Sequence, residues 1–177
     1  MPTSSKKGKA WISNWVQTNN THIKTVLDLG CGAGTYVKLY REKTDMLRSA
    51  HWTGVEVWGA YIEEYNLKDR YDYLINDDIR KLDFFKIGNF DLCFLGDVLE
   101  HMTKEESIAV VDNVLTYCKH VIISIPIVYM PQGAFENNPY EIHIKDDWSD
   151  EEVKSTFSYI KDSAAVSKIG VYYLRKD

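Results

Sequence analysis

The sequence predicts an α/β fold in which a doubly wound, mostly parallel sheet has helices on both of its faces. Two observations predict it. Short apolar runs, typical of buried strands, alternate along the chain with stretches of helical periodicity, and this alternation calls for a parallel sheet. The first apolar run also leads through a glycine-rich turn directly into a helical stretch, which is the connection expected between a parallel strand and its crossover helix.

Length and composition are those of one domain. The chain has 177 residues, of which 45% are hydrophobic, so it can bury a proper core. We expect residues 1–9, which are polar and basic, to form a flexible tail, and residues 10–177 to form the single domain. No run of about 18 apolar residues is present, so no membrane-spanning helix is predicted.

The cysteine content and the net charge limit which cellular compartment and which classes of partner are expected. The three cysteines, Cys31, Cys93 and Cys118, are an odd number without Cys-x-x-Cys spacing, which fits a reducing compartment and predicts a cytoplasmic protein. The formal net charge of -5 argues against a broad nucleic-acid surface, because phosphate contacts need clustered lysines and arginines. We therefore expect a small-molecule substrate rather than a nucleic acid, and a monomer or a homodimer.

The strands are predicted from apolar runs bounded by turn residues. The fourth run, from Phe90 to Leu95, is almost continuously apolar, as in a strand that is buried on both faces. Pro126 ends the fifth run, and two β-like runs close the chain. The predicted strands span residues 25–29, 52–57, 71–75, 90–95, 120–127, 157–161 and 169–174.

The helices are predicted between these runs. Residues 9–17 have apolar side chains at i, i+3 and i+4 spacing and predict a helix that packs on the core. Capping boxes that start at Thr103 and at Ser149 begin two later helices. Two more helices are expected over residues 34–43 and 60–68, and a long loop, of the kind that is usually functional or mobile, over residues 131–148.

Three glycines at every second position, Gly30, Gly32 and Gly34, follow the first predicted strand. Glycine adopts a positive φ without strain and lets a ligand lie against bare backbone, and the helix behind the turn offers free N–H groups. The turn therefore predicts the floor of a nucleotide-sized pocket. In the dinucleotide fingerprint Gly-x-Gly-x-x-Gly, the third glycine would stand where this chain has Thr35, and the carboxylate of Asp28 would repel a pyrophosphate but suits a cationic ligand.

The pattern Asp28-x-Gly30-x-Gly32-x-Gly34 resembles motif I of the class I S-adenosylmethionine (SAM) dependent methyltransferases. This resemblance implies a Rossmann-like sheet of seven strands that ends in a C-terminal antiparallel hairpin, to which the last two predicted strands correspond. It also implies that the glycine loop, including Cys31, faces the methionine part of SAM, with Asp28 nearby.

Glu56 ends the second predicted strand, at the place where an acid can accept hydrogen bonds from both ribose hydroxyls of a nucleotide. Val57 and Trp58 follow it and are assigned to the same site. Trp58 either lies against the adenine ring or packs a helix on the sheet, and both readings stay open. Because SAM and NAD folds share the acid at this position, it supports the fold more than the ligand.

An acid followed by an apolar residue, Asp78-Ile79, comes after the third predicted strand and resembles the adenine clamp of the methyltransferase family. The resemblance implies that Asp78 accepts from the adenine amino group and that the Ile79 backbone pairs with a ring nitrogen. Asp77 is the competing choice, because two adjacent acids allow a slip of one residue.

The segment after the fourth predicted strand, Gly96-Asp97-Val98-Leu99-Glu100-His101, closely resembles the VLEH signature of small-molecule methyltransferases, including the ubiquinone and menaquinone biosynthesis type. The resemblance implies that Leu95, Gly96 and Asp97 contact the cofactor. The Asp/Asn-Pro-Pro-aromatic motif of the N6-adenine DNA methyltransferases is missing, and residues 138–140, which have a single proline, are read as a turn.

The strand ends should meet in space. Right-handed crossovers place the carboxyl ends of parallel strands at one edge of the sheet. We therefore expect one crevice, at the switch point of strand order, to be formed by Asp28, Gly30, Glu56, Asp78 and Gly96.

Two histidines are the candidate catalytic residues. An acceptor hydroxyl must lose a proton, which His101, at the mouth of the crevice, can take. A structural role for His101, as a helix cap or a partner of the backbone, is the alternative. His143, on the long loop, is the second candidate base, and its neighbours Tyr140 and Glu141 are expected to line the acceptor site together with the N-terminal helix.

The segment Asp97-x-x-Glu100-His101 offers three oxygen or nitrogen donors within five residues, so it is a candidate for a metal site. Some ubiquinone-type methyltransferases are thought to hold a divalent ion with a similar Glu-x-x-Glu-His. Here the first acid is Asp97, which is one carbon shorter, so no metal is predicted.

Three functional hypotheses follow. The favoured one is a SAM-dependent methyltransferase that acts on an oxygen, nitrogen or carbon of a small-molecule or glycan acceptor, with S-adenosylhomocysteine (SAH) as product. The second is an NAD(P)-dependent oxidoreductase, against which stand Thr35, Asp28 and the absence of a Tyr-x-x-x-Lys pair beside the crevice. The third is a SAM-binding protein without catalysis.

Overall fold

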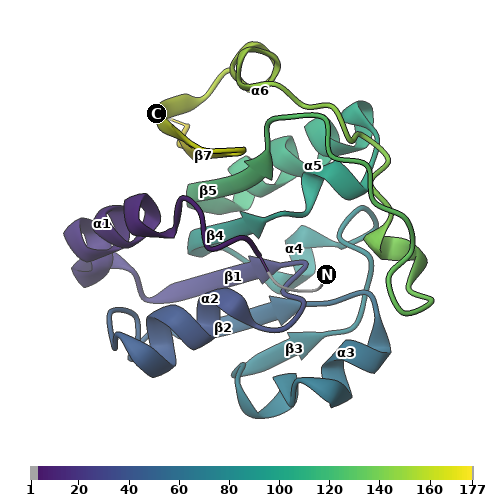
Figure 1. Ribbon diagram of the computed structural model, residues 1–177. Coiled ribbons are helices and arrows are strands. Elements are labelled where there is room, and N and C mark those ends of the chain that lie inside the picture. The colour runs from purple at the N-terminus through teal and green to yellow at the C-terminus, as the bar shows by residue number, and fades with distance from the viewer. Residues whose placement is uncertain (1–3, 177) are drawn as a thin grey trace.

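The protein, a computed structural model that describes residues 4–176, is built on one seven-stranded sheet (Figure 1). The strand order is β3-β2-β1-β4-β5-β7-β6. Strands β1 to β5 pair in parallel, whereas β7 pairs antiparallel with both β5 and β6, so the predicted fold is confirmed. The strands are β1 (Thr25–Leu29), β2 (His51–Val55), β3 (Tyr73–Ile75), β4 (Phe90–Gly96), β5 (Cys118–Pro126), β6 (Ile160–Val166) and β7 (Ile169–Leu174).

Helices cover both faces of the sheet, as predicted. The α-helices are α1 (Lys9–Asn19), α2 (Thr35–Val37), α3 (Gly59–Glu64), α4 (Phe84–Ile87), α5 (Lys104–Tyr117) and α6 (Asp150–Thr156). Short helical segments are η1 (Asn20–His22), η2 (Lys38–Lys43, a π-helix that continues α2), η3 (Leu67–Asp69), η4 (Leu99–His101) and η5 (Pro139–Glu141).

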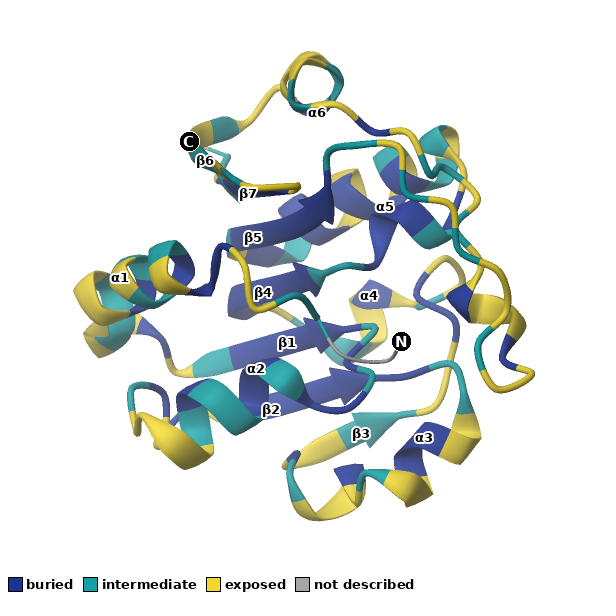
Figure 2. Ribbon diagram, in the orientation of Figure 1, coloured by how far each residue is buried: buried dark blue, intermediate teal, exposed yellow. Residues whose placement is uncertain are grey.

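The core consists of two apolar clusters, one on each face of the sheet. Alternate residues of β4 point to opposite sides, so that Leu92 and Phe94 lie in one cluster and Cys93 and Leu95 in the other. None of the four side chains is exposed, and the central strands are the dark blue centre of Figure 2. Helices α1, α2 and α3 pack on the first cluster, and α4, α5 and α6 pack on the second.

The chain reverses its winding direction between β1 and β4. From β1 it proceeds to β2 and β3 on one side, and from β4 to β5 on the other. In open α/β sheets the crevice outside the carboxyl ends of two such strands is where ligands bind. The fold therefore positions a site above the ends of β1 and β4.

The third strand is shorter than predicted. It begins at Tyr73 rather than at residue 71. The two residues before it bind to neighbouring strands through their side chains and do not extend the strand. The buried Tyr71 donates its hydroxyl to Asp28, and the Asp72 carboxylate accepts from the Trp52 N–H and pairs with Arg41. Both residues are tied to neighbouring strands through their side chains.

The sixth strand was predicted at residues 157–161, which is wrong. It spans Ile160–Val166, because Phe157 is buried at the end of α6 with its ring centroid 6.0 Å from that of Trp148. As an edge strand β6 pairs with β7 alone, and most of its side chains are partly or fully exposed. It has little apolar pattern for that reason.

Two predicted helices are interrupted. The helix predicted over residues 34–43 is α-helical only over Thr35–Val37 and then becomes the π-helix η2. The helix predicted over residues 60–68 divides into α3 and η3 at Asn66, whose φ of 50° is incompatible with an α-helix.

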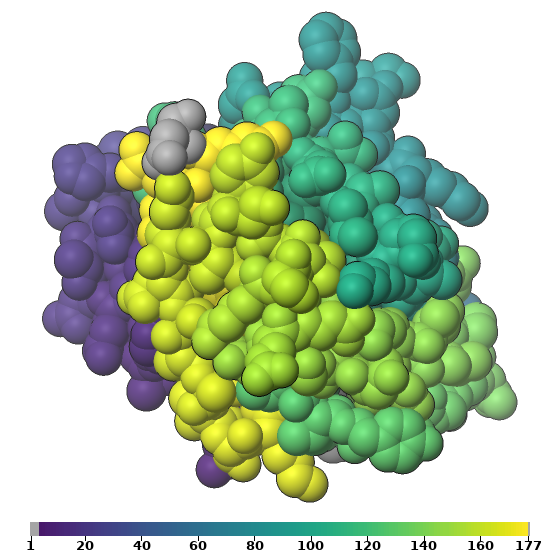
Figure 3. All heavy atoms as spheres, turned by 90° about the horizontal axis from the view of Figure 1, so that it is seen from above, coloured from purple at the N-terminus to yellow at the C-terminus, as the bar shows by residue number. Residues whose placement is uncertain are grey.

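The first helix and the last strands lie side by side. In Figure 3 the purple N-terminal residues border the yellow C-terminal residues, and the ring centroids of Trp15 and Tyr173 are 4.8 Å apart. Within the part of the chain that the structure describes, no helix is long and apolar enough to cross a membrane.

Candidate active site

A cavity of about 360 Å³ lies at the carboxyl edge of the sheet, above β1 and β4. Its wall is formed by strand ends, the start of α2, the loop between β5 and α6, and the segment before α1. Of the residues predicted for the site, the wall contains Asp28, Gly30, Cys31, Gly32, Glu56, Val57, Asp78, Ile79, Gly96, Asp97, His101 and His143. The crevice expected from the topology is therefore present, and it brings these residues together.

At the ends of β1 and β4 the cavity is bordered by two glycines whose positions leave no room for a Cβ atom. Gly30 has a φ of 64°, and a Cβ atom there would lie 2.6 Å from Cγ2 of Val98. Gly96, at the end of β4, has the same constraint, since a Cβ would lie 2.2 Å from the ring of Tyr36. A side chain at either position would displace Val98 or Tyr36, both of which line the cavity.

Glu56 is fixed by the backbone of the neighbouring loops. Its carboxylate accepts hydrogen bonds from the Gly32 N–H and the Trp58 N–H, both 2.8 Å long. The side chain is buried, and burial raises the pKa of its carboxyl, while the two backbone donors act in the opposite direction. The acid thus links the loops after β1 and β2 and presents oxygen acceptors at the wall of the cavity.

Asp28 lines the cavity, and the buried Lys9 ammonium lies behind two residues of the cavity wall. Asp28 is buried and accepts from the Tyr71 hydroxyl at 2.6 Å, and its burial raises the pKa of the carboxyl to about 7. The Lys9 ammonium donates to the hydroxyls of Tyr36 and Ser4 at 2.8 and 2.6 Å, and burial lowers its pKa to about 8.

Sequence reasoning missed Lys9, although a signal was present. Lys9 is one of three buried residues of α1, with Ile12 and Val16, at i, i+3 and i+7. A lysine in line with the apolar face of a helix is a buried cation, and a buried cation needs partners. The predicted tail, residues 1–9, ends at Lys9, which places this charge outside the predicted domain.

Part of the predicted tail lies at the cavity. Residues 1–3 fall outside the described residues, whereas Ser4 and Ser5 line the wall. The Ser5 N–H donates to the carboxylate of Asp97, a residue with a φ of 55° just after β4. The segment before α1 therefore covers the end of β4.

Asp78, not Asp77, lines the cavity, so the structure favours the first of the two alternatives. Its carboxylate is already engaged by the Arg80 guanidinium, with Nε–Oδ1 and Nη2–Oδ2 distances of 2.9 and 2.6 Å. The side-chain hydrogen bonds from Arg80 hold the pKa of Asp78 below its usual range. Sequence reasoning missed this arginine, which also lines the cavity.

Four residues predicted to contact the cofactor do not line the cavity. The Trp58 ring packs toward Tyr140, with centroids 6.3 Å apart, and Tyr140 lines the wall instead. Leu95 points into the apolar cluster under α5, and Gly34 precedes α2 with a φ of 71°. Asp77 turns back and accepts from the N–H of the next residue.

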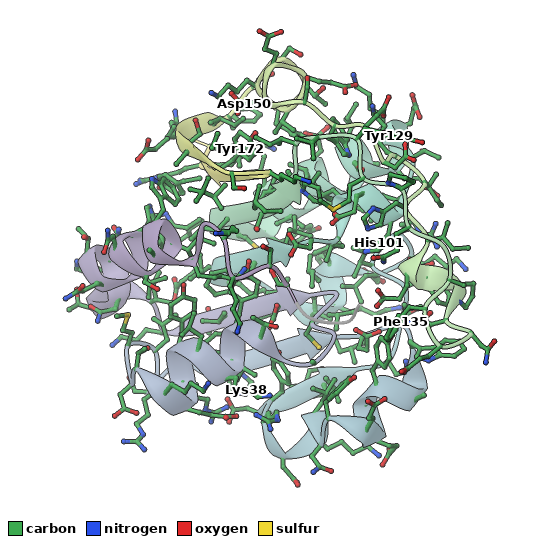
Figure 4. The ribbon with its side chains drawn as sticks, in the orientation of Figure 1. Lys38, His101, Tyr129, Phe135, Asp150 and Tyr172 are labelled. Atoms are coloured by element: carbon green, nitrogen blue, oxygen red, sulfur yellow. The ribbon has the colours of Figure 1, made fainter. Side chains whose placement is uncertain are left out.

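The two predicted bases, far apart in the chain, meet on the opposite wall. The ring centroids of His101 and His143 are 4.9 Å apart in an edge-to-face arrangement. In Figure 4, His101 lies between the ends of the strands and the green loop that follows β5. Its Nδ1–H donates to the Ile142 carbonyl at 3.2 Å, and the His143 Nδ1–H donates to the Met130 carbonyl. Burial and the neighbouring His143 lower the pKa of His101.

The three donors weighed for a metal do not come together as a set. Asp97 faces Ser5 and Ser124, and its place beside Glu100 and His101 is taken by His143. One ligand atom from each of Glu100, His101 and His143 lies within 4.8 Å of the others. If the site holds an ion, these are the residues that bind it.

Comparison with known proteins agrees with this geometry. The family model described as a methyltransferase domain matches residues 26–120, which include the ends of β1, β2 and β4. A search of curated protein sequences found no match.

Solved structures share the fold over nearly the whole chain at low identity. An S-adenosylmethionine-dependent methyltransferase from Clostridium acetobutylicum superposes with a TM-score of 0.71 and 15% identity, over 96% of this chain and 91% of that one. The N-terminal domain of EvdMO1 with SAH bound gives 0.70 and 12%, over 98% and 83%. The methyltransferase domain of the bacterial protein CtHen1 gives 0.69 and 20%, over 97% and 98%. This chain belongs to the methyltransferase domain family and has the fold of the class I SAM-dependent methyltransferases.

Proposed function

We propose that this chain binds SAM in the cavity and transfers its methyl group to a small-molecule or glycan acceptor. The observation that carries the proposal is that one cavity wall combines Glu56, a carboxylate held by two backbone N–H groups where a ribose would be bound, with Asp28, a buried acid that suits a cationic ligand rather than a pyrophosphate. The glycine loop also lacks the Gly-x-Gly-x-x-Gly spacing of the dinucleotide fingerprint, because Thr35 stands in the place of its third glycine. The SAH-bound state of the EvdMO1 domain, a protein of the same fold, is consistent with this cofactor.

Charges along the cavity match the parts of SAM. Asp28 and Asp97 are anionic groups near the glycine loop, where a cationic ammonium or sulfonium would be favoured. The Lys9 ammonium, behind Ser4 and Tyr36, complements the carboxylate of the methionine part. Ile79 provides an apolar contact for the adenine ring at the other end.

Transfer itself needs alignment more than it needs acid–base groups. The methyl group moves in line from sulfur to the acceptor atom, and holding both reactants in that geometry removes roughly 7–11 kcal/mol of the barrier. The acceptor would approach from the wall that contains His101 and His143. Each histidine donates its Nδ1–H to a backbone carbonyl, so its Nε2 retains a lone pair. Such a lone pair suits removal of a proton from an acceptor hydroxyl.

The acceptor proposed here is small and not a polyanion. Several acids line the cavity, including Asp97, Glu100 and Glu141, and the chain has a formal charge of -5. Negative walls repel phosphodiesters and suit neutral or cationic acceptors. The cysteines Cys31, Cys93 and Cys118 are all unpaired and buried, which supports a reducing, cytoplasmic location.

Calorimetric titration with SAH, and with NAD(H) and NADP(H) in parallel, tests the cofactor. We expect micromolar binding of SAH alone, weakened at least about tenfold in Glu56→Ala, which loses a charged hydrogen-bond acceptor. Glu105→Ala, on the exposed side of α5, is the matched control and should bind as the native chain does. Binding of a nicotinamide cofactor in place of SAH would overturn the proposal.

A turnover assay separates an enzyme from a binding protein. Purified chain is incubated with SAM labelled on its methyl group and a panel of hydroxylated, aminated and glycan acceptors. Transfer to any of them, with stoichiometric SAH, supports the proposed activity. SAH binding with no transfer to any member of the panel would favour the alternative of a SAM-binding protein without catalysis.

A further inference from the structure

We propose that Arg80 is a positioning residue that fixes the Asp78 carboxylate as an acceptor for an amino group, so that the cavity takes adenine and rejects hypoxanthine. In hypoxanthine, a carbonyl oxygen replaces the amino group of adenine. Both side chains line the cavity. The inference rests on the proposed function, because the base in question is that of SAM.

The order of the strands places Asp78 at the base end of the cavity. Strands β4, β1, β2 and β3 are successive neighbours in the sheet. Asp97 follows β4, Glu56 follows β2, and Asp78 comes shortly after β3. A nucleoside whose ribose lies at Glu56, and whose charged chain points toward β4, therefore has its base beside Asp78 and Ile79.

Arg80 binds the Asp78 carboxylate with two parallel hydrogen bonds. Its Nε–H donates to Oδ1 at 2.9 Å, and its Nη2–H donates to Oδ2 at 2.6 Å. The backbone N–H of Arg80 also donates to Oδ1, at 3.0 Å. A planar guanidinium that binds both oxygens fixes the plane of the carboxylate, which the point charge of a lysine does not do.

One acceptor position of the carboxylate is left for a ligand. An ionised carboxylate has about four lone-pair positions on its two oxygens. Arg80 fills three of them with the hydrogens on its backbone N, Nε and Nη2. Because Asp78 lines the cavity, a ligand there can donate to the remaining position.

Arg80 is itself held by α5. Its Nη1–H donates to Oε1 of Glu106 at 3.2 Å. The other oxygen of Glu106 accepts from the Thr103 N–H at 2.9 Å, as part of the capping box of that helix. The guanidinium is thus fixed between the loop after β3 and the start of α5, so it orients Asp78 before any ligand binds.

The charged neighbours of Asp78 keep it an acceptor. The side-chain hydrogen bonds from Arg80 hold its pKa below the usual range, and Lys81 acts in the same direction. Of the nearby acids, Asp77 accepts from the Asp78 N–H, and Glu106 of α5 pairs with Arg80. An ionised carboxylate can only accept, so it binds an amino group and repels a carbonyl oxygen.

Calorimetric titration of the full chain with SAH and with S-inosylhomocysteine tests the inference. The two ligands differ only in the base, so the titration of Asp28 and of other cavity groups cancels in the ratio of their affinities. We expect the native chain to prefer SAH by at least about tenfold, because the analogue leaves the carboxylate facing an oxygen. The preference should be the same at about pH 5 and at about pH 8, since Asp78 is ionised at both.

Two substitutions separate the charge of Arg80 from its shape. In Arg80→Gln the pKa of Asp78 rises, so the preference for SAH should fall toward about one as the pH is lowered to about 5, where a protonated carboxyl can donate to the oxygen. Arg80→Lys keeps a positive charge without the planar fork, so the preference should fall at least about threefold at both pH values. Arg48→Gln, which removes an exposed pair with Asp45, is the matched control and should behave as the native chain.

Thermal unfolding checks that each variant is folded. If the native chain binds SAH without a preference over S-inosylhomocysteine, the role of Arg80 is overturned while the proposed function stands. A native preference at both pH values in folded Arg80→Gln has the same meaning, as does a native preference in Arg80→Lys if Arg80→Gln does not fold. A native chain that binds neither ligand overturns both the inference and the proposed function.

Discussion

The two halves of the cavity are built in different ways. The cofactor half, formed by the loops after β1, β2 and β3, uses glycines and acids that directly follow strands. The acceptor half joins η4 to a segment that follows a different strand, so Glu100 and His143 meet only in the folded chain. The comparison teaches that local pattern defines the first half, whereas tertiary packing defines the second.

The halves also differ in how their buried carboxylates are paired. In the cofactor half, the Glu56 carboxylate accepts hydrogen bonds from two backbone N–H groups, which stabilise its negative charge. Glu100 has an Oε2 without a partner among the described residues, and burial raises the pKa of its carboxyl well above the usual range. The buried acid of the cofactor half therefore has its partners within the chain, whereas the buried acid of the acceptor half keeps one oxygen without a partner among the described residues.

Substitution of Gly30 should have the largest effect and break the cofactor half alone. Gly30→Val places a branched side chain at a φ of 64°, with its Cβ 2.6 Å from Val98, and overpacking of this kind costs about 1–3 kcal/mol. We expect SAH affinity to fall about a hundredfold. Gly133→Ala, with nothing within 4 Å of its Cβ, is the control and should leave SAH affinity unchanged.

Glu100→Gln should break the acceptor half alone. The substitution keeps the shape of the side chain but removes its charge, so we expect turnover to fall at least about tenfold with SAH affinity within about twofold of native. Steady-state kinetics and calorimetry on the same preparation measure both quantities. A parallel loss of SAH affinity would show that the halves are not independent.

Asp28→Asn sharpens the comparison through pH. Burial raises the pKa of this carboxyl to about 7, from an ordinary value near about 4. Since the folded pKa is the higher one, the stability that Asp28 contributes is fully present below about pH 4 and is lost as the pH rises to about 7. The free energy of unfolding of Asp28→Asn relative to the native chain should therefore increase between these values and then stay constant. Urea unfolding at four pH values measures it, and a difference independent of pH would contradict the burial argument.

Trp58→Ala should have the smallest effect on binding. The Trp58 ring packs toward Tyr140 outside the cavity wall, so we expect SAH affinity to change less than about threefold. Calorimetry against the native chain checks this, with Tyr140→Ala as the matched aromatic on the wall. If SAH affinity fell more than tenfold in Trp58→Ala, the result would support the alternative that the Trp58 ring lies against the adenine ring.

The central sheet and the cofactor half could be predicted from short segments. The mainly apolar run Thr25–Leu29 and the glycines behind it predicted β1 and its turn, since a central strand is buried on both faces. The edge strand β6 could not be placed this way, because one open face and a single partner leave little pattern to detect. The π-helical continuation of α2 over Lys38–Lys43 was not predicted either.

By itself, the sequence determined the sheet, its switch point and the acids that follow β1 and β2, because each depends on residues adjacent in the chain. Only the tertiary structure decided that Lys9 is buried beside Tyr36 and that the Arg80 guanidinium donates to the Asp78 carboxylate. It also decided that His143, not Asp97, lies next to Glu100 and His101. These contacts depend on where loops and the N-terminal segment settle on the finished sheet. Their positions follow from packing and hydrogen bonds between distant segments, which no local periodicity encodes.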